Sequence, residues 1–154
     1  MKREIFIAGI IQGSSCGKDI CDQSYRQRLT KLLRDALPES RVFCPVEEHP
    51  NSVDYHPDLA RKTFFDLMDR ASRADVLVAF LPQASLGTAI ELWQAHRAGK
   101  ITLTISPMTE NWVVKFISDR NFSCLEDFEE FVRDGKFKEF IEHHERRKQK
   151  DVSA

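Results

Sequence analysis

The chain has 154 residues, of which 42% are hydrophobic and 31% charged, a composition typical of a soluble globular protein and too apolar for a disordered chain. Its 23 basic and 24 acidic side chains give a net charge of −1, which argues against nucleic acid or an anionic membrane as a partner. We expect a small polar ligand. A chain of this length can bury a sizeable core, so we expect one domain over residues 1–148 and a frayed polar tail over 149–154.

The N-terminal residues MKREIFIAGII lack the long apolar segment of a signal peptide, and no stretch is long enough to span a bilayer, so we expect a cytoplasmic protein. Four scattered cysteines do not form a disulfide scaffold, and the C-x4-C pair has no companion at metal-binding spacing. No dinucleotide-binding G-x-G-x-x-G motif is present. We therefore expect reduced thiols, no metal and no cofactor.

Apolar runs with strand character alternate with amphipathic, helix-like segments along the first two thirds of the chain. This alternation predicts right-handed βαβ units and a single doubly wound parallel sheet with helices on both faces, an α/β fold. Residues 124–148 carry phenylalanines at helical spacing and predict two packed helices that are separated at Gly135. The strands are expected at 4–10, 41–46, 75–81 and 101–106, and the intervening helices at 24–37, 59–73 and 88–98.

Ligands of doubly wound sheets bind at the carboxyl ends of the strands, where the crossovers diverge. The segments that follow the predicted strands are rich in glycine, serine, asparagine and other small polar residues. We therefore expect them to gather on one rim and to form the binding site. These segments are 10–19, 46–58, 81–87 and 106–112.

One acidic residue, Glu91, lies inside the apolar segment LPQASLGTAIELW, residues 81–93. Thr88 has the chemistry of a helix N-cap, and Glu91 follows it at the spacing of a capping box, in which the carboxylate reaches back to the backbone of the cap residue. The spacing fits this structural role and a ligand-facing role about equally. Its position after a central strand and a loop of small residues favours the ligand-facing role, and the positive end of the helix is expected to keep Glu91 ionised.

Three segments, IFIAGIIQGS, ADVLVAFLPQASLGTAIELWQAHRAGK and ISPMTENWVVKF, together resemble the nucleoside 2-deoxyribosyltransferase superfamily, which also contains nucleoside 5′-monophosphate N-glycosidases. The resemblance covers roughly the first 120 residues and is most specific at Gly87 and Glu91, four residues apart. It implies a flavodoxin-like sheet and a nucleophilic Glu91. Such a carboxylate displaces the base of a nucleoside or nucleotide through a covalent glycosyl-enzyme, which water or a second base then resolves.

The resemblance also implies an aspartate that assists the leaving base, on the helix before the AD dipeptide. Asp66 is the nearer match, but one extra residue separates it from Ala74, so Asp69 is an alternative. A solvated helix face formed with the neighbouring arginines is a competing interpretation of both residues.

Residues of two loops align with sugar-binding or phosphate-binding positions of the superfamily. Ser85 matches a serine that helps to hold phosphate in the monophosphate hydrolases, and Gly87 belongs to the same loop. The loop after the first strand is expected to approach the ligand closely because glycine allows it. The sequence departs from the superfamily at two positions: Phe6 replaces a common tyrosine, and Gln12 replaces the arginine that contacts phosphate. The loss of this charged donor weakens the case for a 5′-phosphate, unless Lys18, Arg26 or Lys115 substitutes. The first-strand candidates are Gly9, Ile11, Gln12 and Gly13.

Three further groups of residues are weaker candidates for the site. His49 and Asn51 are expected in the pocket, although most loop histidines are simply exposed. Tyr25 could stack on a base and Arg26 could face a phosphate, or they could be a hydrophobic anchor and a surface charge. The resemblance implies that Asn111 reaches the ligand of a neighbouring subunit. The aromatic residues Trp93, Trp112 and Phe116 either form a homo-oligomer interface or fill the core of the monomer.

We therefore expect an enzyme that cleaves or transfers an N-glycosidic bond through Glu91, assembled as a homodimer or higher homo-oligomer. Two rivals stay open: a nucleotide-binding or sensing module without catalysis, and a structural subunit that recruits a partner. Release of free base from a nucleoside distinguishes the enzyme from both.

Overall fold

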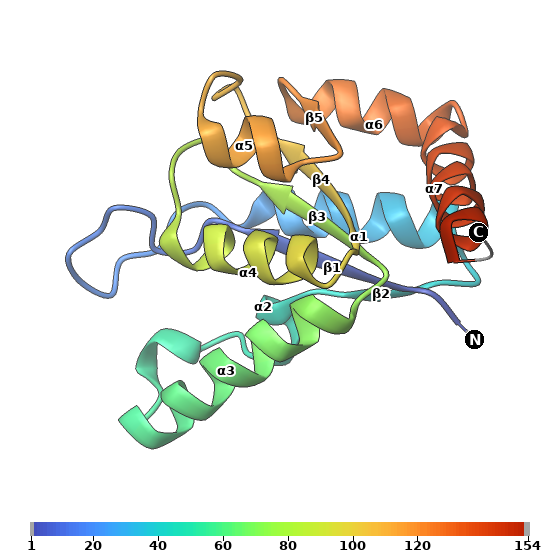
Figure 1. Ribbon diagram of the computed structural model, residues 1–154. Coiled ribbons are helices and arrows are strands. Elements are labelled where there is room, and N and C mark those ends of the chain that lie inside the picture. Colours follow the sequence, from blue (N-terminus) through green and yellow to red (C-terminus); the bar gives the residue numbers. More distant parts are fainter. Residues whose placement is uncertain (1, 153–154) are drawn as a thin grey trace.

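A computed structural model describes residues 2–152 of the chain, with one five-stranded sheet in the order β2-β1-β3-β4-β5 (Figure 1). All neighbouring strands run parallel. Because β1 and β3 are covered on both faces, their side chains are almost all buried, which explains their continuous apolar sequences. The strands are β1 (Glu4–Gly9), β2 (Arg41–Phe43), β3 (Val76–Phe80), β4 (Ile101–Ile105) and β5 (Arg120–Phe122).

Helices cover both faces of the sheet and bury two separate apolar clusters. The face covered by α1 (Ser24–Ala36), α6 (Leu125–Arg133) and α7 (Lys136–Val152) buries a cluster rich in isoleucine, leucine and phenylalanine. The opposite face is covered by α3 (Pro57–Arg73), α4 (Leu86–Arg97) and α5 (Trp112–Ile117), and its cluster is smaller and richer in alanine. The doubly wound α/β prediction is therefore confirmed.

Several boundaries differ from those expected. Helix α4 begins at Leu86, two residues before the expected Thr88, since Ser85 caps it. The helical break at Gly135 is present, with a positive φ of 77° that favours glycine. Helix α7 continues to Val152, past residue 148, because its polar residues are good helix formers and no glycine or proline interrupts them. The last two residues of the expected tail, 153–154, lie outside the described residues.

Three short elements were not expected. They are β5, the edge strand beside β4, and α2 (Pro45–Glu48) and the 3-10 helix η1 (Ser52–Asp54), which follow β2 at the carboxyl edge of the sheet. Figure 1 shows the long loop between β1 and α1 projecting from this carboxyl edge. The loop after β1, η1 and the first turn of α4 form the rim above the strand ends.

Candidate functional site

A cavity of about 470 Å³ opens at the carboxyl edge of the sheet, on the face covered by α3 and α4. One wall is the backbone after β1 and another is the first turns of α4. The third wall combines η1 with the inward face of α3. The residues that line the cavity are Gly9, Ile11, Gln12, Gly13, Ser15, Ser52, Val53, Tyr55, Ala60, Thr63, Phe64, Leu67, Met68, Ser85, Leu86, Gly87, Thr88 and Glu91.

The wall after β1 depends on two glycines, both of which were predicted to lie in the site. A Cβ atom on Gly9 would clash with the phenol oxygen of Tyr25 behind it. Gly13 has a positive φ of 59°, and a Cβ atom there would lie 2.9 Å from the Cδ1 atom of Ile10. Gln12 stabilises the loop by donating a hydrogen bond from Nε2 to the carbonyl oxygen of Gly17, 3.0 Å away. Packing against Tyr25 and Ile10 therefore requires glycine at positions 9 and 13 of this wall.

Glu91 lies in the second turn of α4 with its side chain directed at the cavity, and it is only 8% exposed. The capping box with Thr88 is absent. Ser85 caps the helix instead: its Oγ accepts hydrogen bonds from the backbone N–H of Thr88, at 3.5 Å, and from the Thr88 hydroxyl, at 3.0 Å. Within residues 2–152 no hydrogen bond or ion pair is recorded for the Glu91 carboxyl group. It is thus available to a ligand.

Burial raises the pKa of Glu91 to about 8, and the positive charge of Arg26 opposes part of this rise. The help that the positive end of the helix was expected to give to the ionised form is therefore not sufficient. The carboxyl group is one turn too deep for the first free amides of the helix, which the dipole effect requires. The loss of hydration is the larger effect, since it disfavours the charged form.

The two aspartates proposed to assist the leaving base do not line this cavity. Asp66 and Asp69 are exposed on the outer surface of α3, and Asp66 forms an ion pair with Lys62, one turn away. The cavity-facing positions of α3 recur at the spacing of one helical face. A mostly apolar stripe at this spacing in the sequence could have predicted this wall. The α3 residues that line the cavity are Ala60, Thr63, Phe64, Leu67 and Met68.

His49 and Asn51 lie just outside the lining of the cavity. The Nδ1 atom of His49 is 3.1 Å from the hydroxyl of Tyr55, which does line it. Asn51 precedes η1 without a side-chain hydrogen bond to it. In this segment Ser52, Val53 and Tyr55 line the cavity, whereas His49 and Asn51 do not.

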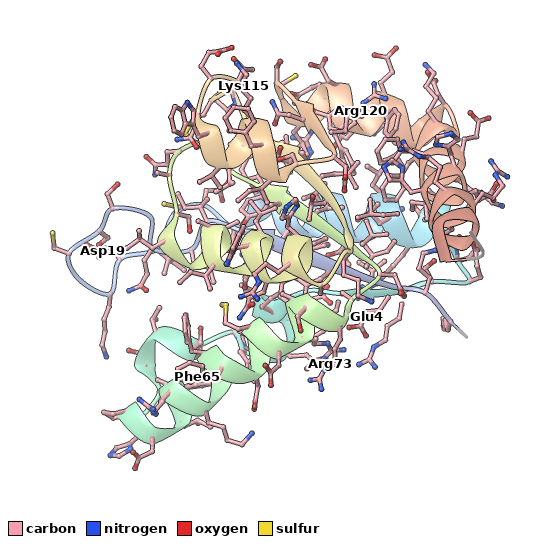
Figure 2. All side chains as sticks on the ribbon, in the orientation of Figure 1. Glu4, Asp19, Phe65, Arg73, Lys115 and Arg120 are labelled. Atoms are coloured by element: carbon pink, nitrogen blue, oxygen red, sulfur yellow. The ribbon has the colours of Figure 1, made fainter. Side chains whose placement is uncertain are left out.

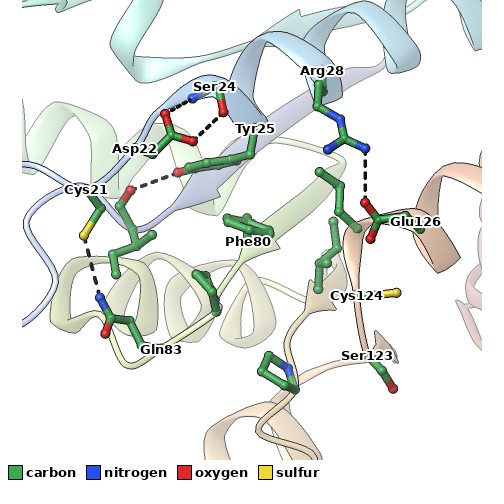
Figure 3. Close-up of a pocket in the computed structure, with 15 residues that line it drawn as sticks. Cys21, Asp22, Ser24, Tyr25, Arg28, Phe80, Gln83, Ser123, Cys124 and Glu126 are labelled. Atoms are coloured by element: carbon green, nitrogen blue, oxygen red, sulfur yellow. Dashed lines mark hydrogen bonds and ion pairs between the residues drawn. The ribbon is translucent and has the colours of Figure 1, made fainter.

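Tyr25 lines a second cavity, of about 480 Å³, on the opposite face of the sheet (Figure 3). Its ring stacks on Phe80 at a centroid distance of 4.2 Å, and its hydroxyl donates a hydrogen bond to the carbonyl oxygen of Ile10. Figure 3 also shows Cys21 and Cys124 in this cavity, well separated from each other. Tyr25 is thus an anchor between the two cavities and is not a lining residue of the Glu91 cavity.

Arg26 is 3% exposed and does not line the Glu91 cavity either. Its guanidinium donates hydrogen bonds to the carbonyl oxygens of Ile7 and Gly9 and to the side chain of Gln23. The interpretation of Arg26 as a surface charge is wrong, and a direct contact with a ligand in this cavity would require these hydrogen bonds to break.

Asn111 lies away from the Glu91 cavity, as the N-cap of α5, where its side chain accepts a hydrogen bond from the backbone N–H of Val113 at 3.0 Å. Beside it, apolar side chains of α4 and α5 are exposed instead of filling the core. Leu86 is 85% exposed and Trp112 is 78% exposed. We call this surface the α4/α5 patch, formed by Leu86, Ile90, Trp93, Trp112 and Phe116.

Among residues 2–152 no group of three or more histidine, cysteine, aspartate or glutamate side chains is arranged to hold a metal ion. In the same part of the chain no helix has both the length and the apolar character needed to cross a bilayer.

Comparisons with known proteins identify the fold. No protein-family profile and no curated protein matches the sequence. Among solved structures, a 2-deoxyribosyltransferase from Bacillus psychrosaccharolyticus is similar, with a TM-score of 0.61 and 21% identity over 82% of this chain and 90% of that chain. A conserved protein from Enterococcus faecalis V583 has a TM-score of 0.61 and 16% identity, over 87% of this chain and 99% of that chain. The chain therefore has the fold of a 2-deoxyribosyltransferase.

Proposed function

We propose that this protein cleaves or transfers the N-glycosidic bond of a nucleoside, with Glu91 as the nucleophile, and that it is a member of the nucleoside 2-deoxyribosyltransferase superfamily. The observation that supports this function most strongly is the Glu91 carboxyl group, which is buried at the base of a ligand-sized cavity without a protein partner in contact. A buried acid without a partner destabilises the fold, and acids of this kind are found mainly at functional sites. The shared fold with a 2-deoxyribosyltransferase supports the same conclusion.

In the proposed reaction, a carboxylate oxygen of Glu91 attacks C1′ of the sugar and forms a glycosyl ester. The C1′–N bond breaks, and its electron pair leaves with the base, which takes up a proton from water. Water then attacks C1′, the ester bond breaks, and the carboxylate is regenerated with release of the sugar. If a second base attacks C1′ instead, a new nucleoside forms.

The polarity of the walls suggests how the substrate lies. Flat, weakly polar nucleobases fit the apolar side chains of α3, including Phe64 and Leu67. The sugar hydroxyls fit the opposite side, where Gln12, Ser15 and Ser85 offer polar groups near Glu91. This arrangement brings C1′ between the α3 wall and the carboxyl group.

The charges of the cavity favour a nucleoside without a 5′-phosphate. No lysine, arginine or histidine is present among the residues that line it in the described part of the chain. Lys18 is 2.9 Å from Asp54, and Lys115 is 2.7 Å from Glu110. Figure 2 shows Lys115 beside α5, at the edge of the molecule away from α3. The three cations that could replace the missing arginine, Lys18, Arg26 and Lys115, thus all have other partners.

The α4/α5 patch supports a homodimer as part of the proposal. Aromatic residues concentrate at protein interfaces, and large contiguous apolar patches are uncommon on monomers. The patch adjoins the cavity, because Leu86 belongs to both. A second subunit on this surface would bury the aromatic side chains and narrow the mouth of the cavity.

The first prediction concerns the reaction. Incubation with a panel of nucleosides releases free base, and Glu91→Gln lowers kcat at least about a thousandfold, since an amide cannot form the ester. Chromatography of the products measures it. Glu39→Gln, a change of an exposed glutamate, leaves the rate unchanged. The 5′-monophosphate of the best substrate reacts with a kcat/KM at least about tenfold lower, because the cavity offers no cation to a dianion.

Failure to release base from any nucleoside would contradict this function. If nucleosides then bound equally well to Glu91→Gln, the protein would be a binding or sensing module. Release of a base from the monophosphate alone would contradict the preference for an uncharged substrate.

The second prediction concerns stability. The folded-state pKa of Glu91, about 8, lies above its ordinary value of 4.5, so the folded protein holds an extra proton between these pH values. Stability is therefore lost as the pH rises from about 4.5 through 8. Relative to the wild type, Glu91→Gln gains up to roughly 4 kcal/mol in free energy of unfolding between pH 4 and pH 9. Urea unfolding at both pH values measures this gain, and Glu39→Gln shows none. A constant difference between Glu91→Gln and wild type at the two pH values would contradict it.

The third prediction concerns assembly. The wild-type chain is a dimer by light scattering, and Trp112→Glu converts it to a monomer, because a charge within the α4/α5 patch cannot be buried at an interface without a partner. Phe65→Glu, at an exposed aromatic residue of α3 outside the patch, leaves the dimer intact. A wild-type monomer at all protein concentrations tested would rule out the homodimer.

A further inference from the structure

Arg26 is a buried cation whose recorded partners are all uncharged. Its Nε atom is 2.8 Å from Oε1 of Gln23, its Nη2 atom is 2.8 Å from the carbonyl oxygen of Gly9, and its Nη1 atom is 3.2 Å from that of Ile7. No ion pair with a carboxylate is recorded for Arg26 within residues 2–152. A buried guanidinium without a counterion is costly, and backbone oxygens offset only part of the cost. Packing alone does not explain why a charged side chain occupies this buried position.

The position of this guanidinium relates it to the Glu91 cavity. It is bonded to the carbonyl oxygen of Gly9, and Gly9 itself lines the cavity together with Glu91. The charge of Arg26 therefore lies directly behind the β1 wall, while the carboxyl group lies on the α4 side. Arg26 is 3% exposed and Glu91 8% exposed, and charges in a protein interior act on each other more strongly than at a surface.

We propose that Arg26 is a positioning residue: its fixed, buried charge favours the ionised form of Glu91 in the cavity, although Arg26 does not touch the substrate. As a functional assignment this inference rests on the proposed reaction, since only a nucleophilic Glu91 needs to be ionised. The three hydrogen bonds fix the guanidinium at the end of β1. An arginine suits this position because its planar fork can reach several acceptors at once.

The other ionisable groups around Glu91 do not supply this charge. Tyr25 lies beside Arg26 on α1, and burial raises its pKa far above neutrality, so it stays uncharged. Tyr55, directly after η1, is an ionisable side chain in the cavity lining. The Sγ atom of Cys44 lies 4.0 Å from Nη1 of Arg26. The cavity-facing side of α3 carries no ionisable side chain. Arg26 is the opposing charge acting on Glu91, and its effect is to lower the pKa of that carboxyl group.

The ionisation of Glu91 can be measured without turnover. Protein labelled with ¹³C at the glutamate carboxyl carbons is titrated by NMR, and the Glu91 signal is assigned by its absence from Glu91→Gln. In the wild type this signal titrates near pH 8. In Arg26→Met the midpoint moves upward by about one pH unit, which is the lower end of the effect of a nearby opposite charge. The kcat/KM at pH 7 falls by about tenfold in parallel, because one tenth as much Glu91 is ionised.

Two further variants separate electrostatics from structural damage. Arg26→Lys keeps the charge and loses hydrogen bonds, so it is less stable but titrates close to the wild type. Arg28→Met removes an exposed arginine of the same helix, paired with Glu129, and leaves the midpoint unchanged. If Arg26→Met does not fold, Arg26→Gln, which can still donate to a carbonyl oxygen, takes its place.

A folded Arg26→Met or Arg26→Gln protein in which Glu91 titrates at the wild-type midpoint would overturn the inference. The same holds if Arg28→Met shifts the midpoint as much as Arg26→Met does. An upward shift in a protein that releases no base would instead contradict the proposed reaction while leaving the electrostatic role of Arg26 intact.

Discussion

The site depends on one physical constraint, the removal of a carboxyl group from water without a partner in direct contact. Glu91 is buried between the backbone after β1, the first turns of α4 and an apolar wall from α3. Desolvation raises its pKa to about 8, so a proton occupies it for part of the physiological range. In the proposed reaction, the same desolvation makes the ionised form a stronger nucleophile. Under this proposal the buried acid lowers the stability of the fold and raises the reactivity of the site.

The parallel sheet places this acid where a ligand can reach it. Strands β1 and β3 are adjacent at the centre of the sheet, and the loops after them diverge to opposite faces. The backbone of Gly9 separates the Glu91 cavity from Tyr25 and Arg26, which belong to the other face. Arg26 on one side of the sheet thus lies close enough to lower the pKa of Glu91 on the other side. This coupling connects the packing of α1 to the chemistry proposed for α4.

The sequence was sufficient to predict the parallel sheet, its main helices and the approach of Gly9, Gly13, Ser85, Gly87 and Glu91 to one cavity. Strand periodicity and loop composition are local properties of the sequence, so predictions based on them do not require knowledge of the tertiary structure. Predictions that required the orientation of a helix were less successful. Asp66 and Asp69 were chosen from the resemblance to the superfamily, but the rotation of α3 directs Thr63 and Leu67 toward the cavity instead. The burial of Arg26 could not be predicted from the sequence either, because its backbone acceptors are brought to it only by tertiary packing.

Covalent trapping tests the central claim most directly. A nucleoside with fluorine at C2′ destabilises the oxocarbenium-like transition state, so that the glycosyl-enzyme forms but breaks down slowly. The account predicts that mass spectrometry of the intact protein shows one added sugar per chain, and that peptide mapping places it on Glu91. Base release from the unmodified nucleoside without an adduct from the fluorinated one, or an adduct on another residue, would contradict a glutamate nucleophile at position 91.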